Sequence, residues 1–142
     1  MNKKIIIIPI VIIIGIFAAM SLEPSEKVDD EIFHVTLADP QLYENGIYSD
    51  SFLISEGEYH FRFVPNGSSP ETLSISLNGS ELDFSEDFKL ENTLHQTGIS
   101  EYYTWEYLGQ KEITVSENQQ VIIIINPNGN VMGSVSVDIL EN

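Results

Sequence analysis

Apolar and polar residues alternate with a period of two along this chain, from residue 32 to its end. In the clearest example, Tyr59, Phe61 and Phe63 alternate with His60 and Arg62. Successive side chains of a β-strand point to opposite faces, so this period is typical of strands with one buried face. No apolar stripe with the 3.6-residue spacing of a helix occurs in the same part of the sequence. The pattern predicts an all-β domain over residues 32–142, built as an antiparallel β-sandwich of about eight or nine strands.

Turn-forming residues divide the alternation into strands. The turn at residues 55–58 separates two expected strands, 47–54 and 59–64, which should pair as an antiparallel hairpin. Asn78-Gly79 is a signal for a two-residue hairpin turn, after which Leu82 and Phe84 belong to the returning strand.

Two later segments complete the expected strand pattern. A further strand is expected over residues 88–94, before a loop at 95–100. The run VIIII at residues 121–125 does not alternate, which predicts a central strand covered on both faces.

Residues 5–22 form an uncharged, predominantly apolar run that follows Lys3 and Lys4. As a helix, these 18 residues at about 1.5 Å each would measure about 27 Å, slightly less than the roughly 30 Å of a bilayer's hydrocarbon core. Two interpretations remain open: an uncleaved membrane anchor, or a signal segment removed near Ala18, Ala19 and Ser21. Both place the rest of the chain outside the cytoplasm, because the lysines favour the cytoplasmic side.

The expected organisation is therefore an anchor or signal segment at 1–22, an acidic stalk at 23–31 and an extracytoplasmic domain at 32–142. The expected location is the cell membrane, with a single crossing, or the exterior if the segment is cleaved. From residue 23 onward there are 22 acidic residues and four basic ones, which gives a formal charge of −18. Such a surface repels nucleic acid, which we exclude as a partner. The chain has no cysteine, so stability must come from an ordinary hydrophobic core.

The most aromatic stretch is YYTWEYL at residues 102–108. Its parity places Tyr103, Trp105 and Tyr107 on one face of a strand, with Thr104 and Glu106 on the other. If the aromatic face is inside the sandwich, it fills the core, which is the interpretation that the polar opposite face favours. If it is exposed, these three side chains are candidates for contact with a protein partner or for stacking on sugar rings.

Two short segments carry a resemblance to known modules. They resemble the strand-turn-strand units of small secreted jelly-roll sandwiches, namely the Golgi-dynamics (GOLD) domain and the bacterial pre-peptidase C-terminal domain. The segments are YSDSFLISEGEYHFRFVPNG and VIIIINPNGNVMGSVSVDI. The resemblance rests on Gly57, Tyr59, Phe61 and residues 126–129. The resemblance implies a jelly-roll-like fold and an accessory, non-catalytic interaction module. The isoleucine-rich segment before an acidic, cysteine-free β-domain also resembles archaeal surface proteins.

The sequence gives little support for catalysis or for a cofactor. His34, His60 and His95 are the only histidines, and they have no metal-ligand or catalytic spacing, so we expect exposed surface histidines and no metal site. No nucleophile-elbow, phosphate-binding or dinucleotide-binding motif is present. Loop carboxylates could bind Ca²⁺ weakly, as in an adhesion domain. A hydrolase that uses surface carboxylates is also considered as a function, and nothing in the strand pattern favours it.

Two Asn-x-Ser sequons, at Asn66 and Asn78, fall in expected turns and are candidates for glycosylation. The sequence therefore predicts a membrane-tethered, non-catalytic β-sandwich that acts as an interaction module or as an accessory subunit of a membrane or envelope complex. A glycan-binding surface module is the alternative.

Overall fold

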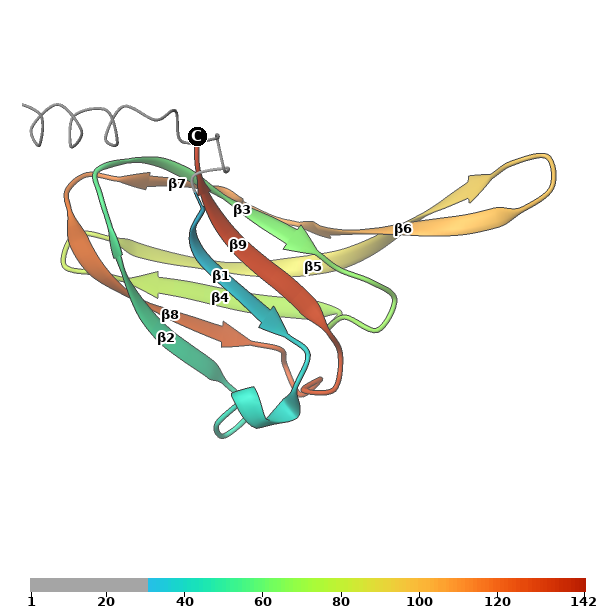
Figure 1. The fold of residues 1–142 in the computed structure, drawn as a ribbon, viewed down its shortest axis with the longest axis horizontal. Coiled ribbons are helices and arrows are strands. Elements are labelled where there is room, and N and C mark those ends of the chain that lie inside the picture. Colours follow the sequence, from blue (N-terminus) through green and yellow to red (C-terminus); the bar gives the residue numbers. More distant parts are fainter. Residues whose placement is uncertain (1–30) are drawn as a thin grey trace, which may run out of the picture.

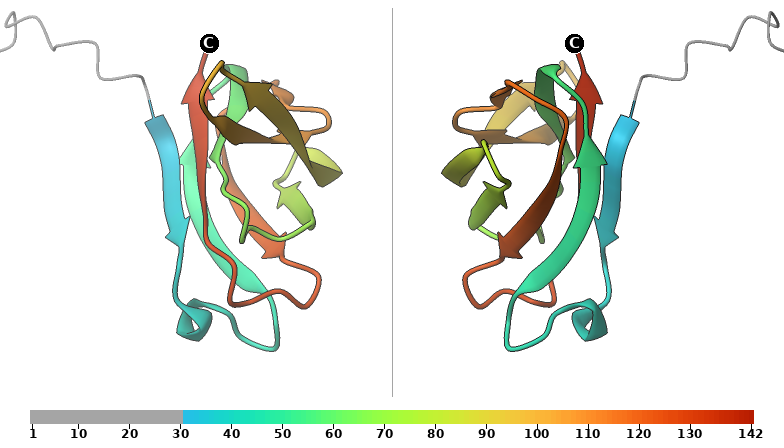
Figure 2. Two further views of the ribbon diagram at one scale, coloured as in Figure 1. Left: turned by 90° about the vertical axis from the view of Figure 1, so that its right-hand side faces the viewer. Right: turned by 90° about the vertical axis from the view of Figure 1, so that its left-hand side faces the viewer.

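The computed structural model describes residues 31–142, which form two antiparallel β-sheets packed face to face (Figures 1 and 2). One sheet has the strand order β1-β9-β3-β7, and the other has the order β2-β8-β4-β5-β6. The elements are β1 (Glu31–Leu37), the 3₁₀-helix η1 (Pro40–Leu42), β2 (Tyr48–Ile54), β3 (Gly57–Val64), β4 (Thr72–Asn78), β5 (Asp83–Gln96), β6 (Glu101–Leu108), β7 (Glu112–Val115), β8 (Gln119–Asn126) and β9 (Val135–Glu141). The prediction of an all-β antiparallel sandwich is confirmed.

The core lies between the two sheets and is built from the alternation in the sequence. In β3, Tyr59 and Phe61 are each 2 % exposed, whereas Arg62 on the opposite face is exposed. Phe61 packs edge-on against Phe88 of the other sheet, with ring centroids 5.6 Å apart. Burying one such side chain stabilises the fold by about 1.5–3 kcal/mol. Apolar residues of both inner faces thus form one continuous core.

The expected hairpin between residues 47–54 and 59–64 is wrong. β2 pairs with β8 in the five-stranded sheet, and β3 pairs with β9 and β7 in the four-stranded sheet. The chain crosses from one sheet to the other at residues 55–56. Both arrangements bury the same apolar face of each strand, so alternation alone does not distinguish them.

The hairpin of β4 and β5 is confirmed, but its turn lies further along than expected. The Gly79 N–H donates to the Leu82 carbonyl oxygen over 2.8 Å, so Ser80 and Glu81 form the two-residue turn. β5 then continues to Gln96 without a break. The short strand at 82–84 and the strand at 88–94 are therefore one strand, and the loop expected at 95–100 shrinks to residues 97–100.

β8 lies inside its sheet between β2 and β4, but only one of its faces is covered. Ile123 and Ile125 are fully buried, whereas Ile122 is 49 % exposed. The prediction of cover on both faces is therefore wrong. A run of isoleucines has no polar residue to mark its outer side, and this hides the alternation.

The membrane segment expected at residues 5–22 and the stalk up to residue 30 lie outside the described residues. Within residues 31–142, no helix is long and apolar enough to cross a membrane. β1 begins at the end of the sandwich where the C-terminus lies (Figure 1). There the backbone N–H of Asn142 donates a hydrogen bond to the carbonyl oxygen of Glu58.

Candidate functional site

A two-stranded arm leaves the body of the sandwich and is its most distinctive feature (Figure 1). The pairing of β4 with β5 ends at Thr72 and Lys89, but β5 and β6 stay paired as far as Gln96 and Glu101. Residues 90–107 therefore form a ribbon that β4 does not accompany, and we call it the arm. At about 3.4 Å per residue, its strands run roughly 24 Å past the last β4 pair.

One face of the arm continues the core face of the sheet. Tyr107 at the base is fully buried, Trp105 is partly buried, and Tyr103 further out is 54 % exposed. The predicted parity of these three residues is confirmed. The interpretation that all three side chains fill the core is confirmed for Tyr107 and wrong for Tyr103. The opposite sheet does not reach beyond the base of the arm, so nothing in the described part of the chain covers Tyr103. The same face of β6 is therefore buried where it lies between the sheets and open to solvent further along the arm.

The base of the arm is fixed by contacts to the loop at residues 65–71. The Tyr107 hydroxyl donates to the Pro70 carbonyl oxygen over 2.6 Å. Burial raises the pKa of Tyr107, and the nearby phenol of Tyr43 adds to the effect. Gly67 lies against the Trp105 indole so closely that an added Cβ would be 3.0 Å from the ring. This loop therefore orients both the buried and the half-buried aromatic side chain.

An open groove of about 700 Å³ lies where the loop at residues 65–71 meets the arm. Trp105 and Leu90 provide apolar surface, while Lys89, Glu91 and Asn92 provide charged and amide groups. Lys89 Nζ donates to the hydroxyl oxygen of Thr72 over 3.1 Å, which links β5 to the start of β4. Such a mixture of a half-exposed aromatic ring and polar groups is suited to a polar ligand with an apolar face.

The opposite face and the tip of the arm also carry uncovered apolar surface. Tyr102 is 51 % exposed and stacks on His95, with ring centroids 4.8 Å apart. His95 Nε2 is also 2.8 Å from the Thr104 hydroxyl oxygen, so this face is ordered by local contacts. Ile99 at the tip is fully exposed. Among the described residues, nothing packs over this combination of apolar side chains.

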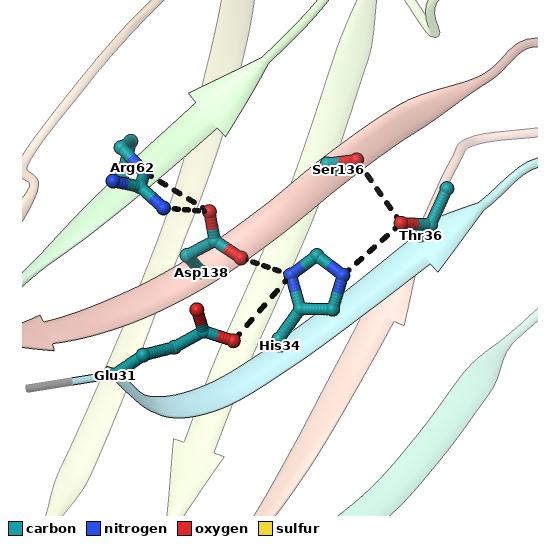
Figure 3. Close-up of polar contacts among 6 residues, drawn as sticks. All are labelled: Glu31, His34, Thr36, Arg62, Ser136 and Asp138. Carbon is teal, nitrogen blue, oxygen red and sulfur yellow. Dashed lines mark hydrogen bonds and ion pairs between the residues drawn. The ribbon is translucent and has the colours of Figure 1, made fainter. Parts of the chain in front are cut away.

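A second feature is a polar cluster on the outer face of the four-stranded sheet (Figure 3). His34, Asp138 and Arg62 lie directly opposite one another on β1, β9 and β3. His34 Nδ1 donates to Asp138 Oδ1, and Arg62 donates from Nε and Nη2 to Asp138 Oδ2 over 3.0 and 2.9 Å. Glu31 Oε1 lies 3.6 Å from the same His34 nitrogen. These contacts compensate the cost of burying Asp138, whose side chain is only 3 % exposed.

The other ring nitrogen of His34 is also held. The Thr36 hydroxyl lies 3.2 Å from His34 Nε2 and 3.2 Å from the Ser136 hydroxyl oxygen. Sequence reasoning missed this cluster because 104 residues separate His34 from Asp138. Glu31 and His34 are three residues apart, a spacing that places side chains on opposite faces of a regular strand, and only the irregularity of β1 between Glu31 and Phe33 lets both approach Asp138.

The other sequence-based candidates stay separate from these features. His60 contacts Asn142 Oδ1, and His95 belongs to the arm. Both sequon asparagines are exposed. The side chain of Asn66 is engaged with Ser68 and Ser134, whereas Asn78 makes one long contact of 3.5 Å to Ser76. Glycosylation of either residue stays a prediction.

No protein-family model matches this chain, and neither the comparison with curated proteins nor that with solved structures finds a significant match.

Proposed function

We propose that this protein is a non-catalytic interaction module, tethered to the outer side of a membrane by residues 5–22, that binds a protein partner through its arm. The observation that carries the proposal is the apolar surface of the arm. Leu94 is 42 % exposed, Tyr102 and Tyr103 are each about half exposed, and Ile99 is fully exposed. Leu94 and Tyr103 share one face of the arm, Tyr102 lies on the other face and Ile99 is at the tip. Aromatic side chains are enriched in protein–protein interfaces, and exposed apolar surface of this kind marks interaction sites.

The topology supports the idea that the arm is an addition to a standard scaffold. Without β6, the strand orders are β1-β9-β3-β7 and β2-β8-β4-β5, two four-stranded sheets between which the chain passes repeatedly. We propose that this is a jelly roll, the eight-stranded fold that the resemblance to GOLD-like and pre-peptidase modules implies. β6 extends this scaffold at one edge, and functional segments are often additions to rigid scaffolds.

The physical properties of the arm favour a protein as its partner. An isolated two-stranded ribbon is marginally stable in water, so a ribbon that projects alone gains from being covered. β6 is an edge strand of eight residues, four of them aromatic, which suits pairing with another chain. The charged residues of the arm are Glu91, Glu101 and Glu106, so a neutral or basic surface fits it best.

The proposed tether determines where the partner is found. Because β1 begins at Glu31, the stalk comprises the eight residues 23–30, which reach at most about 28 Å when fully extended, so the domain stays near the membrane surface. The arm projects sideways from the body of the sandwich (Figure 1). We therefore place the partner next to this protein in the same membrane or envelope, which fits an accessory subunit.

An arm-deleted variant tests this proposal. Residues 94–103 are replaced by Asn-Gly, which closes the ribbon at the paired residues Thr93 and Thr104 with a turn suited to a hairpin. The residues removed are outside the buried core, so the variant should fold with little loss of stability. Its matched control is Leu53→Ser, which removes an apolar side chain that is 79 % exposed on β2.

Both variants are expressed in the native cells, and protein complexes are isolated after mild crosslinking. We expect one co-migrating protein with the wild type and with Leu53→Ser, and its loss with the arm-deleted variant. A partner that stays bound without the arm would contradict the assignment of the arm. A wild-type protein that migrates alone would contradict the proposed function.

A second candidate function is glycan binding, which the groove beside Trp105 favours. Tyr103 and Trp105 lie with ring centroids 6.4 Å apart on the same face, next to the amide of Asn92. Titration with oligosaccharides, followed by Trp105 fluorescence, tests this function because Trp105 is the only tryptophan. A saturable change that Tyr103→Ser weakens would support glycan binding. Trp105 emission that no oligosaccharide alters would remove this candidate.

A further inference from the structure

We propose that Glu31, His34 and Asp138 form a binding site for a divalent transition-metal ion of the Zn²⁺ class. One ligand atom from each side chain lies within 4.8 Å of the other two (Figure 3). A tetrahedral ion with bonds of about 2.1 Å needs ligand atoms about 3.4 Å apart. His34 Nδ1 lies 3.6 Å from Glu31 Oε1, which is close to this separation, whereas it is in direct contact with Asp138 Oδ1. A small rotation of His34 away from Asp138 would open the space that the ion needs. The side chains of Glu31 and His34 are 35 % and 48 % exposed and have room to move, while Asp138 stays fixed.

Neighbouring residues hold the ligands in the way that metal sites require. Metal-binding histidines commonly have the other ring nitrogen in a hydrogen bond, and metal-binding carboxylates are themselves hydrogen-bonded. Here Thr36 contacts His34 Nε2, and Arg62 holds Asp138 Oδ2. Asp138 is therefore held firmly in place, while the Thr36 contact guides the ring orientation of His34 and leaves it room to rotate. When the ion binds, neutral His34 changes tautomer: Nδ1 loses its proton to solvent and Nε2 takes one up from solvent, so that Nε2 then donates to the Thr36 hydroxyl oxygen and the imidazole stays neutral.

The charges of the cluster favour a dication. Glu31 and Asp138 carry two negative charges, and Arg62 carries one positive charge, so the cluster with neutral His34 has a net charge of −1. The acidic surface of the whole domain raises the local concentration of cations as well. A bound dication would change the net charge of the cluster to +1 without displacing Arg62 from Asp138 Oδ2.

The donor set selects the kind of ion. An imidazole nitrogen with carboxylate oxygens suits Zn²⁺ and related transition metals. Ca²⁺ and Mg²⁺ prefer six or more oxygen ligands, which two carboxylates with one imidazole do not provide. The site therefore differs from the weak Ca²⁺ binding by loop carboxylates that the sequence suggested.

The position of the site gives the ion a structural role. β1 is an edge strand, held along one side only by β9. Glu31 is its first residue and His34 lies near its middle, while Asp138 lies within β9. A bound ion would fasten the start of β1 to the interior of the sheet, next to the stalk that precedes it.

Calorimetric titration of the full chain in detergent micelles with ZnCl₂, CaCl₂ and MgCl₂ tests the site. We expect saturable binding of one Zn²⁺ per chain. His34→Gln and Glu31→Gln should each weaken it at least tenfold, and Thr36→Val about tenfold through the loss of the outer contact. His60→Gln is the matched control, because His60 is a histidine on the same sheet outside the cluster. Circular dichroism confirms that each variant is folded, and Glu31→Gln keeps the test valid should His34→Gln fail to fold.

Hydrogen exchange provides a readout that is independent of affinity. At a Zn²⁺ concentration that just saturates the wild type, exchange of the β1 amides should slow in the wild type and in His60→Gln, and it should slow much less in His34→Gln and Glu31→Gln. The proposal is overturned if no one-to-one Zn²⁺ binding is found, if His34→Gln binds Zn²⁺ as the wild type does, if His60→Gln loses binding equally, or if Ca²⁺ binds more tightly than Zn²⁺.

Discussion

Replacement of Tyr107 by phenylalanine removes a single oxygen atom from the point where the arm joins the sandwich. The Tyr107 side chain is fully buried, and its hydroxyl donates to the Pro70 carbonyl oxygen over 2.6 Å. Pro70 is itself buried, and the described residues offer its carbonyl oxygen no other hydrogen-bond donor. The substitution thus breaks one hydrogen bond and leaves a buried acceptor unsatisfied.

The expected loss in the free energy of unfolding is about 1–3 kcal/mol, which is the cost of an unsatisfied buried polar group. For a domain of this size, each kcal/mol lowers the melting temperature by roughly 4 °C. The assay is chemical unfolding of the full chain in micelles, followed by the fluorescence of Trp105, which lies near the altered contact.

Tyr102→Phe is the matched control, because it removes the same atom from a half-exposed side chain of the same strand. It should change the free energy of unfolding by less than about 0.5 kcal/mol. The reasoning is refuted if Tyr107→Phe costs less than about 0.3 kcal/mol, or if Tyr102→Phe costs as much as Tyr107→Phe.

Three further predictions concern the core and the partly buried tyrosines beside it. Tyr43→Phe should leave stability unchanged or raise it by up to about 1 kcal/mol, because the buried Tyr43 hydroxyl has no hydrogen-bond partner among the described residues; a loss above about 1 kcal/mol in urea unfolding would contradict this. Ile123→Ala should cost about 2–5 kcal/mol and the neighbouring Ile122→Ala less than about 1 kcal/mol, because only Ile123 is fully buried; equal losses in the same assay would show that both faces of β8 are covered. Burial, with Asp50 adding to it, raises the pKa of Tyr48 to about 12. The folded state therefore favours the protonated phenol. Its contribution to stability is complete below the unfolded pKa of about 10 and is lost as the pH rises towards 12. Melting temperatures measured from pH 9 to 12 should fall more steeply for the wild type than for Tyr48→Phe. Parallel curves would contradict the prediction that the raised pKa of Tyr48 contributes to stability.

The sequence predicts the fold class well because burial in a sandwich follows strand parity. Residues such as Phe61, Ile75 and Val137 could be assigned to the core from alternation alone, and all three are buried. Strand partners could not be assigned in this way, since β2 buries the same face whether it pairs with β3 or with β8. Parity also does not indicate where the opposite sheet stops, so it placed Tyr103 in the core together with Tyr107.

The candidate sites were less accessible to sequence reasoning than the fold. The arm depends on β5 continuing past the start of β4, and the stretch from Leu90 to His95 gives no apolar alternation strong enough to indicate that length. The cluster of His34, Asp138 and Arg62 depends on the register of three strands that are distant in the sequence. Both features follow from strand pairing, which a single sequence does not determine.

Site-specific photo-crosslinking in native membranes tests the central claim, that the arm is the contact surface, most directly. A photoreactive amino acid replaces Tyr103 on the arm or, as the reference position, Leu53 on the distant strand β2. We predict a single crosslinked protein partner from position 103 and none from position 53. Crosslinks to the partner from position 53 alone, or from neither position, would contradict the account.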